Sequence, residues 1–222
     1  MIECGAVAKI YATERGAIEA VKGIDLTVPR GQFAAIVGRS GSGKSSLLAM
    51  IGGLSRPTRG CIRVDDIDIW NLSSTGLAQF RNRQIGFVFQ FASLLPTLRV
   101  IDNVALPALL GRVSDADHAY GEATELLTRV GLGDRIEAYP AEISAGEHRR
   151  AVLARALINA PALLLADEPT SDLDEDTERE IMEQLRGVNR ERAMTLIMVT
   201  HNLRLAEQTD RVVHLGDGGL LA

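Results

Sequence analysis

The sequence is poor in cysteine and has no excess of basic charge. Its 222 residues include only 2 cysteines, Cys4 and Cys61, which are too few for a disulfide framework and match no metal-ligand spacing. Reduced thiols of a cytosolic protein are therefore expected. Lys and Arg total 24 against 29 Asp and Glu, and the net charge of −5 argues against a protein that is held on nucleic acid by a basic face.

Long hydrophobic runs are also absent. The longest uncharged run covers residues 84–98, which is shorter than the roughly 20 predominantly apolar residues that a membrane-spanning helix needs. The first residues carry charges at Glu3, Lys9, Glu14 and Arg15 and contain no apolar signal-peptide core. With 46% apolar and 24% charged residues, the composition is that of a globular chain. We expect a soluble, intracellular and mildly acidic protein.

Short apolar runs alternate with helical patterns along most of the chain. Strands are expected at residues 24–28, 33–37, 61–69, 85–89, 162–166, 196–199 and 211–215. Helices are expected at residues 46–54, 122–130, 147–158 and 175–189, with a short one before the last strand. This alternation predicts an α/β fold with a mostly parallel sheet. No repeat or linker interrupts it, so we expect one domain over residues 1–222 with an inserted helical subdomain at about residues 91–159.

A glycine-rich loop follows the apolar run at 33–37 and opens a predicted helix. It fits the pattern G-x-x-x-x-G-K-[ST], in which glycines let backbone N–H groups surround phosphate oxygens and the helix N-terminus adds partial positive charge. A flexible turn, the alternative, would need neither the lysine nor the preceding strand. We predict a nucleoside triphosphate site, with Lys44 on the β- and γ-phosphates and the Ser45 hydroxyl on Mg²⁺. The nucleotide-binding residues predicted here are Gly38, Arg39, Ser40, Gly41, Ser42, Gly43, Lys44, Ser45 and Ser46.

Two adjacent carboxylates, Asp167 and Glu168, follow the apolar run that starts at residue 162. Such a run delivers both side chains to the C-terminal edge of a parallel sheet, where α/β proteins bind ligands. Asp167 is predicted to complete the Mg²⁺ site that Ser45 begins, and Glu168 to orient or deprotonate the attacking water. A solvated turn is the alternative, and the phosphate loop disfavours it.

With both elements in place, the sequence resembles the ATP-binding subunits of ABC transporters. Within that class it looks like the group that powers lipoprotein release, macrolide export and a related cell-division complex. The resemblance covers residues 9–220, with a candidate for every family motif in the expected order. It implies a P-loop NTPase core with a mostly parallel sheet, an N-terminal antiparallel β portion and an inserted helical subdomain.

The resemblance adds residues to the nucleotide site. Tyr11 stands where the family places an aromatic that stacks on adenine, although a lone tyrosine near a strand is more often part of a core. Gln90 corresponds to a glutamine that touches Mg²⁺ and senses the membrane partner, and His201 to a histidine that contacts the γ-phosphate and positions water. Residues 91–96 and 103–107 look like the group's membrane-protein contact region, and a helical core would account for their apolar side chains equally well.

Residues 143–147 occupy the place of the family signature Leu-Ser-Gly-Gly-Gln, and basic side chains follow at 148–150. In the family this helix N-terminus points at the γ-phosphate bound by the opposite subunit, whereas ordinarily such a serine is an N-cap. Basic side chains are unfavourable at a free helix N-terminus, and a facing triphosphate would relieve that conflict. Because Ala145 replaces a glycine and Glu147 a glutamine, we expect slower turnover. The residues implied to act in trans are Ser144, Ala145, Gly146 and Glu147.

Residues 171–174 match the family loop that crosses the dimer interface, where Asp172 and Asp174 stand. The same residues read as a capping box, with acidic side chains that the helix dipole favours in the first turn. The two interpretations are compatible with each other.

Taken together, these motifs imply an ATPase that dimerises around two ATP molecules with Mg²⁺ and powers a separate membrane permease. Its implied task is export or the extrusion of lipoproteins, peptides or drugs. Glu168, His201 and Lys44 are the expected catalytic residues. The expected partners are the permease and a second ATP-binding subunit, with no nucleic acid, and the expected location is the cytoplasmic face of the inner membrane.

Three other kinds of ATP-using protein share parts of this pattern. An ABC-type ATPase that regulates cell-wall enzymes through a membrane partner, without transport, remains the alternative. A DNA-repair ATPase is disfavoured because the chain has no heptads and a net charge of −5. An ordinary P-loop kinase would lack the combination of Ser144, Asp174 and His201.

Overall fold

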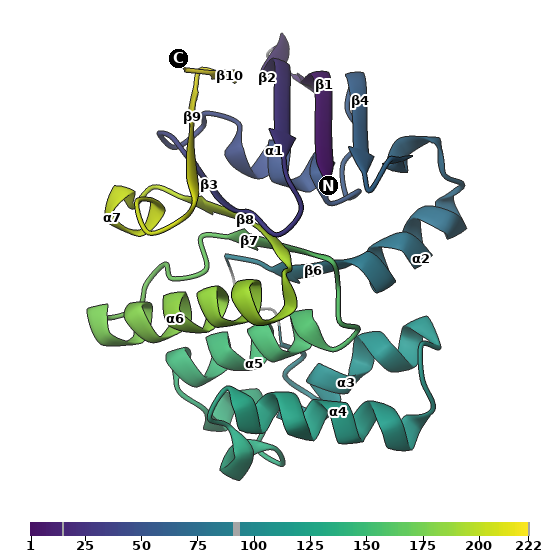
Figure 1. The fold of residues 1–222 in the computed structure, drawn as a ribbon, viewed down its shortest axis with the longest axis vertical. Helices are drawn as coiled ribbons and strands as arrows, with labels where there is room; N and C mark the ends of the chain where they lie inside the picture. Colours follow the sequence, from purple (N-terminus) through teal and green to yellow (C-terminus); the bar gives the residue numbers. More distant parts are fainter. Residues whose placement is uncertain (15, 91–93, 222) are drawn as a thin grey trace.

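The computed structural model describes residues 1–14, 16–90 and 94–221. These residues contain a six-stranded sheet in the order β10-β9-β3-β8-β7-β6 and a four-stranded sheet in the order β2-β1-β4-β5 (Figure 1). The larger sheet is made of β3 (Phe33–Val37), β6 (Ile85–Val88), β7 (Leu163–Asp167), β8 (Thr195–Thr200), β9 (Arg211–Gly216) and β10 (Gly219–Leu220). The smaller sheet is made of β1 (Ile2–Thr13), β2 (Gly16–Val28), β4 (Arg59–Val64) and β5 (Ile67–Asp68).

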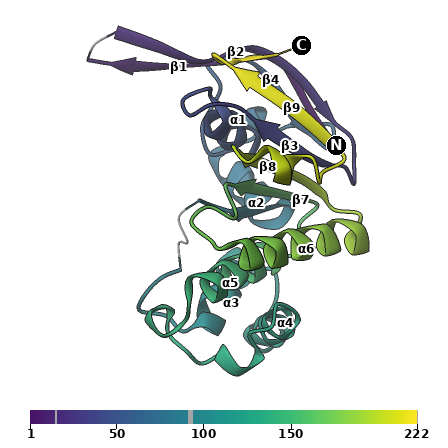
Figure 2. The ribbon, with the colours of Figure 1, turned by 90° about the vertical axis from the view of Figure 1, so that its left-hand side faces the viewer.

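The helices divide into those beside the sheets and those at the far end of the molecule. They are α1 (Lys44–Ile51), α2 (Ser74–Gln84), α3 (Val100–Gly111), α4 (Ala116–Arg129), α5 (Ala145–Leu157), α6 (Glu175–Arg192) and α7 (Leu203–Ala206), with short 3-10 turns at Ile69–Asn71, Gly133–Arg135 and Pro140–Glu142. Figures 1 and 2 show α3, α4 and α5 at the end remote from the smaller sheet, with α6 between them and the parallel strands. In the described part of the chain, no helix combines the length and the apolar character that crossing a bilayer requires.

The central strands of the larger sheet are short apolar runs, as expected for parallel strands that are covered on both faces. The side chains of β3 and β8 are buried along their whole length, and those of β7 up to its last residue. β3 pairs in parallel with β8 and β9, while β7 pairs in parallel with β6 and β8. Val37 lies opposite Thr200, and Asp167 opposite Val199, so the carboxyl ends of these strands meet at one edge of the sheet.

Alternate side chains of the parallel strands supply two hydrophobic cores, one on each face. Phe33, Ala35 and Val37 pack in the core that includes α3 to α6, whereas Ala34 and Ile36 pack in the core shared with α1 and the smaller sheet. Figure 2 shows α1 between the smaller sheet and β3. A shift of β3 by one residue would exchange the two sets, so its register is strongly specified.

This architecture confirms the predicted α/β fold with a mostly parallel sheet and an antiparallel N-terminal portion. The prediction of a single strand at 61–69 is wrong. The chain there forms β4, a tight turn and β5, because Asp65 and Asp66 adopt positive φ angles of 48° and 64° and reverse its direction. Aspartate tolerates this left-handed region better than most residues, since its short side chain can hydrogen-bond locally.

Helix boundaries also differ from the expected ones. Helix α1 begins at Lys44 rather than at residue 46, and it ends at Ile51 because Gly53 turns away with φ 68°. Helix α4 begins at Ala116 rather than at 122, with the Asp115 carboxylate capping it. Helix α2 is missing from the prediction because its apolar signal is weak: none of its residues is fully buried, and it packs on the core through the half-buried Leu77 and Phe80.

A buried asparagine at the start of α3 holds the segment that precedes this helix. Asn103 is 0% exposed. Its Nδ2 donates to the carbonyl oxygens of Leu95, Leu98 and Arg99, each at 3.1 Å, and its Oδ1 accepts from the Leu95 N–H at 2.7 Å. The side chain thus satisfies the Leu95 N–H and the Leu98 carbonyl, and it adds a second bond to the carbonyls of Leu95 and Arg99, which also accept from the N–H groups of Leu98 and Asn103.

We predict that Asn103→Ala lowers the free energy of unfolding by about 2–4 kcal/mol, because the Leu95 N–H and the Leu98 carbonyl lose their partner and two further bonds are lost with them. Urea denaturation followed by circular dichroism measures the change. The matched control is Asn71→Ala, since the exposed Asn71 makes a single hydrogen bond to Asp68, at 2.8 Å, and its loss should cost about 0.5 kcal/mol or less. Equal losses in the two variants would contradict the role given to Asn103.

Candidate functional site

The strand order of the larger sheet brings its predicted functional loops together. β3, β8, β7 and β6 are consecutive neighbours, and each ends at the same edge. The loop at 38–45 follows β3, His201 follows β8, Glu168 follows β7, and Gln90 lies just beyond β6. Residues far apart in the sequence therefore form one site.

The glycine-rich loop is closed against its neighbours. Gly43 is the N-cap of α1 with φ 96°, and a Cβ on it would lie 2.2 Å from the Ala20 carbonyl oxygen of β2. A Cβ on Gly38 would lie 2.2 Å from the Leu215 carbonyl oxygen of β9. Both positions exclude a side chain, so glycine here lets the loop pack tightly while α1 keeps its N-terminus free for a ligand.

Lys44 places its charge inside the loop. Its side chain is buried, with Nζ donating to the carbonyl oxygens of Gly38 at 2.9 Å and Arg39 at 3.0 Å. No acidic residue stands in the first turn of α1. The ammonium group and the helix N-terminus together make this an anion-binding position.

A cavity of about 440 Å³ opens over this loop, and we call it the phosphate-loop cavity. It brings the loop together with the ends of β6, β7 and β8, and its lining residues are Ala20, Ser40, Gly41, Ser42, Gly43, Lys44, Ser45, Ser46, Gln90, Glu168 and His201. A volume of this size, lined by polar donors and one carboxylate, fits a small charged ligand.

Ser45, which lines the phosphate-loop cavity, contacts Asp167, which does not. The Ser45 hydroxyl donates to Asp167 Oδ1 at 3.2 Å. Burial raises the pKa of Asp167 and the charge of Glu168 adds to the rise, while the Ser45 hydrogen bond and Lys44 oppose it. A half-buried carboxylate with a hydroxyl beside it is a donor set that suits a hard cation such as Mg²⁺. Among the residues that the structure describes, no group of three His, Cys, Asp or Glu side chains could enclose a metal alone, so Mg²⁺ would take its other ligands from water and phosphate.

Glu168 and His201 form a pair across the site. His201 Nδ1 lies 2.9 Å from Glu168 Oε1, and the side chain of Glu168 is 13% exposed against 73% for His201. Glu168 also adopts a positive φ of 48°, with its N–H donating to the Val199 carbonyl at 2.9 Å. Non-glycine residues rarely adopt this conformation, and they do so more often at functional sites.

Tyr11 and Gln90 both lie near the phosphate loop. The Tyr11 hydroxyl is 3.2 Å from the Ser46 Oγ of α1, and its ring, which is 39% exposed, has the Lys9 ammonium 5.1 Å from its centroid. Gln90 is exposed and lines the phosphate-loop cavity. Tyr11 is therefore next to the phosphate loop but is not part of the cavity lining.

The signature residues do not join the phosphate-loop cavity of their own chain. Ser144 caps α5, with its Oγ accepting from the Glu147 N–H at 3.2 Å while Glu147 Oε2 accepts from the Ser144 N–H at 2.7 Å. The Ser144 backbone N–H is the main reason that the pKa of Glu147 is lowered. Ala145 is exposed and has no positive φ, so its Cβ brings no backbone strain, whereas a Cβ on Gly146 would lie 2.8 Å from Thr177.

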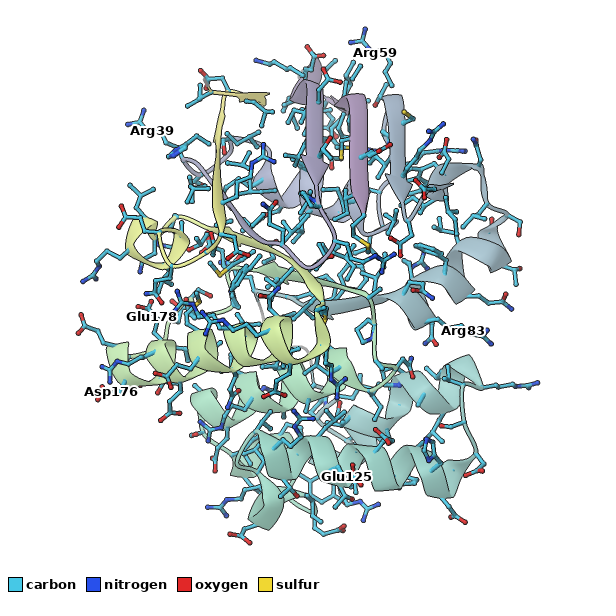
Figure 3. The ribbon with its side chains drawn as sticks, in the orientation of Figure 1. Arg39, Arg59, Arg83, Glu125, Asp176 and Glu178 are labelled. Carbon is cyan, nitrogen blue, oxygen red and sulfur yellow. The ribbon has the colours of Figure 1, made fainter. Side chains whose placement is uncertain are left out.

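The loop before α6 borders a second cavity, of about 300 Å³. We call it the Asp172 cavity, and it shares Gln90, Glu168 and His201 with the first one. Asp172 lines it with φ 63°, while Asp174 caps α6 through Asp176 and Thr177. Figure 3 shows the side chain of Arg39 at the periphery of the molecule, on the same side as Asp176 and Glu178 at the start of α6.

Sequence reasoning missed several residues around these cavities. They are Ala20, Thr170, Glu178, Thr200 and Asn202. Asn202 had a local signal, since its side chain caps α7 by accepting from the Arg204 N–H at 3.1 Å. Ala20 had none, because β2 reaches the loop only through the tertiary fold. Residues 91–93 of the predicted contact region lie outside the described residues, whereas 103–107 fall within α3.

Comparison with known proteins gives this geometry a family context. Residues 21–171 match the family model described as ABC transporter. The chain is 46% identical over 222 residues to the lipoprotein-releasing system ATP-binding protein LolD of Geobacter metallireducens, covering 100% of this chain and 98% of the relative. It is 45% identical over 218 residues to LolD of Syntrophotalea carbinolica, covering 98% of this chain and 96% of the relative.

A solved structure agrees with these relatives. The ATP-binding cassette MJ0796, in a dimeric post-hydrolysis state bound to ADP and Pi, superimposes with a TM-score of 0.93 at 35% sequence identity. The match covers 100% of this chain and 97% of that one. The likeness therefore extends over the complete fold described above.

We predict that Asp167→Asn raises the melting temperature of the nucleotide-free and Mg²⁺-free chain at pH 7. Burial raises the pKa of Asp167 in the folded state, so its ionised form opposes folding, and the amide removes that cost while still accepting the Ser45 hydrogen bond. The stability associated with protonated Asp167 is fully present below the unfolded pKa of 3.8 and is lost as the pH rises through the raised folded-state pKa. The advantage of the variant should therefore grow from acidic to neutral pH.

Differential scanning calorimetry across this pH range measures the effect. The exposed Asp134→Asn variant controls for the loss of one negative charge. A lower melting temperature for Asp167→Asn than for the unmodified chain at pH 7 would show that the buried carboxylate is not destabilising.

Proposed function

This chain belongs to the ABC transporter family, and on that premise we propose that it is the ATP-hydrolysing subunit of a lipoprotein-releasing transporter. The family and the full-length relatives make it an ATP-binding ATPase cassette. The observation that carries the proposal is the convergence of the glycine-rich loop, Glu168 and His201 on the phosphate-loop cavity. The cargo class follows the name of the two LolD relatives, each of which spans nearly the whole chain.

The proposed binding mode places the triphosphate on the glycine-rich loop. Backbone N–H groups of the loop and the N-terminus of α1 take the phosphate oxygens, and Lys44 lies between the β- and γ-phosphates. The exposed ring of Tyr11 stacks on adenine. Ser45, Asp167 and Gln90 would hold Mg²⁺, which neutralises charge on the β- and γ-oxygens when bound.

The proposed chemistry is an in-line displacement at the γ-phosphorus. Glu168 takes a proton from the attacking water as the new oxygen–phosphorus bond forms, and the bond to the β–γ bridging oxygen breaks with its electron pair leaving on ADP. His201, held 2.9 Å from Glu168 Oε1, is placed to contact the γ-phosphate and to fix the water. Lys44 stabilises the charge of the transferred phosphoryl group.

Two subunits complete each site in this proposal. The Ser144–Gly146 helix start lies outside the phosphate-loop cavity of its own chain, which suits a role at the partner's γ-phosphate. The loop with Asp172 and Asp174 then crosses the interface. Ser144 and Glu147 cap helix α5, and neither they nor Ala145 line the phosphate-loop cavity of their own chain. We therefore expect Ala145 and Glu147 to affect the rate of turnover rather than nucleotide binding. Both homodimers and heterodimers suit this arrangement.

An apolar groove of about 430 Å³ is the proposed contact with the permease. Phe87, Phe89, Leu106, Pro107 and Leu110 line it, and Leu110 is 74% exposed. Phe89 lines the groove and the next residue, Gln90, lines the phosphate-loop cavity, so this short segment gives a route from ATP hydrolysis to the membrane protein. The proposed location is accordingly the cytoplasmic face of the membrane that holds the permease.

We predict that Glu168→Gln binds ATP with unchanged affinity, hydrolyses it at least roughly a hundredfold more slowly, and accumulates as an ATP-dependent dimer. The amide keeps the size of the side chain but cannot take the proton. Phosphate release and size-exclusion chromatography with light scattering measure the two effects. Glu125→Gln, at an exposed position of α4 that lines neither cavity, is the control. Turnover of ATP by Glu168→Gln at the parent rate would remove Glu168 from its proposed role.

The cargo and the partner are tested with the permease that copurifies with this chain from membranes. In proteoliposomes that hold the complex and a labelled lipoprotein, ATP should release the lipoprotein to an acceptor. Leu110→Asp should reduce copurification of the permease at least roughly tenfold, because it places a charge in an apolar contact. Efflux of a macrolide without lipoprotein release would assign a drug as cargo, and ATP turnover without movement of either would favour the regulatory alternative.

A further inference from the structure

Arg149 is a buried cation that joins three separate parts of the molecule. It lies in α5, shortly after Ser144, and its residue is 6% exposed. Nη1 donates to the carbonyl oxygens of Phe89 at 2.9 Å and Gln90 at 2.6 Å. Nη2 donates to the carbonyl oxygen and to the Oγ of Ser171, both at 3.3 Å. One guanidinium group thus connects the signature helix with the loops that follow β6 and β7.

Stability alone does not account for a charge in this position. None of the ion pairs between described residues includes Arg149. Burial lowers the pKa of Arg149, and the charge of Asp172 only partly opposes this. Removing a charge from water without a carboxylate partner is costly, and a well-packed apolar side chain often stabilises such a place better. The planar fork of arginine, by contrast, can bond two loops at once in a fixed geometry.

The two loops are those that border the nucleotide site. Gln90 lines both the phosphate-loop cavity and the Asp172 cavity. Ser171 lines the Asp172 cavity together with Glu168 and Asp172. The helix that carries Arg149 begins at the segment proposed to face the partner's ATP. Arg149 therefore bonds residues that border the ATP site of its own chain. It lies in α5, whose N-terminus is proposed to act at the ATP site of the partner subunit.

We propose that Arg149 is a positioning residue. It makes the segment 89–90 after β6, the segment around Ser171 after β7 and helix α5 move as one rigid body, and so couples the two ATP sites of the dimer. The inference rests on the proposed function, in which Ser144 acts in trans. Because Arg149 touches neither nucleotide nor water in this arrangement, it acts on turnover and on dimer closure, not on the capture of ATP by one subunit.

The test uses the full chain with three substitutions. Arg149→Met keeps an apolar stem and removes every donor of the guanidinium, while Arg149→Lys keeps the charge but has a single ammonium that cannot bond both loops in the same way. Arg129→Met is the matched control, because the exposed Arg129 of α4 pairs with Glu191 of α6 and lines neither cavity. Each is measured for kcat, KM and the Hill coefficient for ATP, for binding of a fluorescent ATP analogue, and for melting temperature.

A structural role and a positioning role predict different changes in kcat, the Hill coefficient, analogue binding and melting temperature. We expect Arg149→Met to lower kcat by roughly tenfold or more and to reduce the Hill coefficient toward about 1, with analogue binding changed by less than about twofold. In a Glu168→Gln background it should weaken ATP-dependent dimerisation by roughly tenfold. Arg149→Lys should recover part of each loss, and Arg129→Met should behave as the parent.

Several results would overturn the inference. Values of kcat and of the Hill coefficient in Arg149→Met that equal those of the parent chain would contradict it. A fall of both melting temperature and analogue binding in Arg149→Lys would also contradict it, because that result indicates a purely structural role. If Arg149→Met does not fold, Arg149→Lys decides, and full parent behaviour of that variant shows that the fork is not needed. Absence of ATP hydrolysis by the parent chain, or of a dimer with Glu168→Gln alone, would instead count against the proposed function.

Discussion

The parallel pairing of β6, β7, β8 and β3 is the constraint on which the nucleotide site depends. Because these strands run in the same direction and end at the same level, segments far apart in sequence meet at one edge. The contacts of Ser45 with Asp167 and of Glu168 with His201 both cross from one strand end to another. Burial of β3, β7 and β8 on both faces fixes the register that these contacts require.

Charged side chains lie close to the same edge of the sheet, and their charges are only partly neutralised by other groups of the protein. Lys44 and Arg149 are bonded to backbone carbonyl oxygens, and burial opposes the ionisation of Asp167. A folded chain that keeps such groups gives up some stability in its ligand-free state. In our account the triphosphate, its Mg²⁺ and the partner subunit supply the missing charges, so nucleotide binding, dimer closure and stability are linked.

The sequence predicts the parts of the site whose signals are local. The phosphate loop and the pair Asp167–Glu168 are contiguous and stand after apolar runs, so both their chemistry and their edge position follow from pattern. Helix α2 has no fully buried residue and packs on the core only through the half-buried Leu77 and Phe80, so its apolar signal is weak. The turn at Asp65 and Asp66 depends on two backbone conformations that alternation does not reveal. The contacts of Arg149 and of Ala20 join segments that only the tertiary fold brings together, and no spacing in the sequence indicates them.

The central claim is that one sheet edge makes these separate loops into a single ATP site. Hydrogen–deuterium exchange of the full chain, read by mass spectrometry with and without ATP and Mg²⁺, tests it most directly. The account predicts that nucleotide slows exchange together in the peptides that contain the loop at 38–45, Glu168 and His201, which come from three different parts of the chain. Protection confined to the glycine-rich loop, with unchanged exchange around Glu168 and His201, would contradict it.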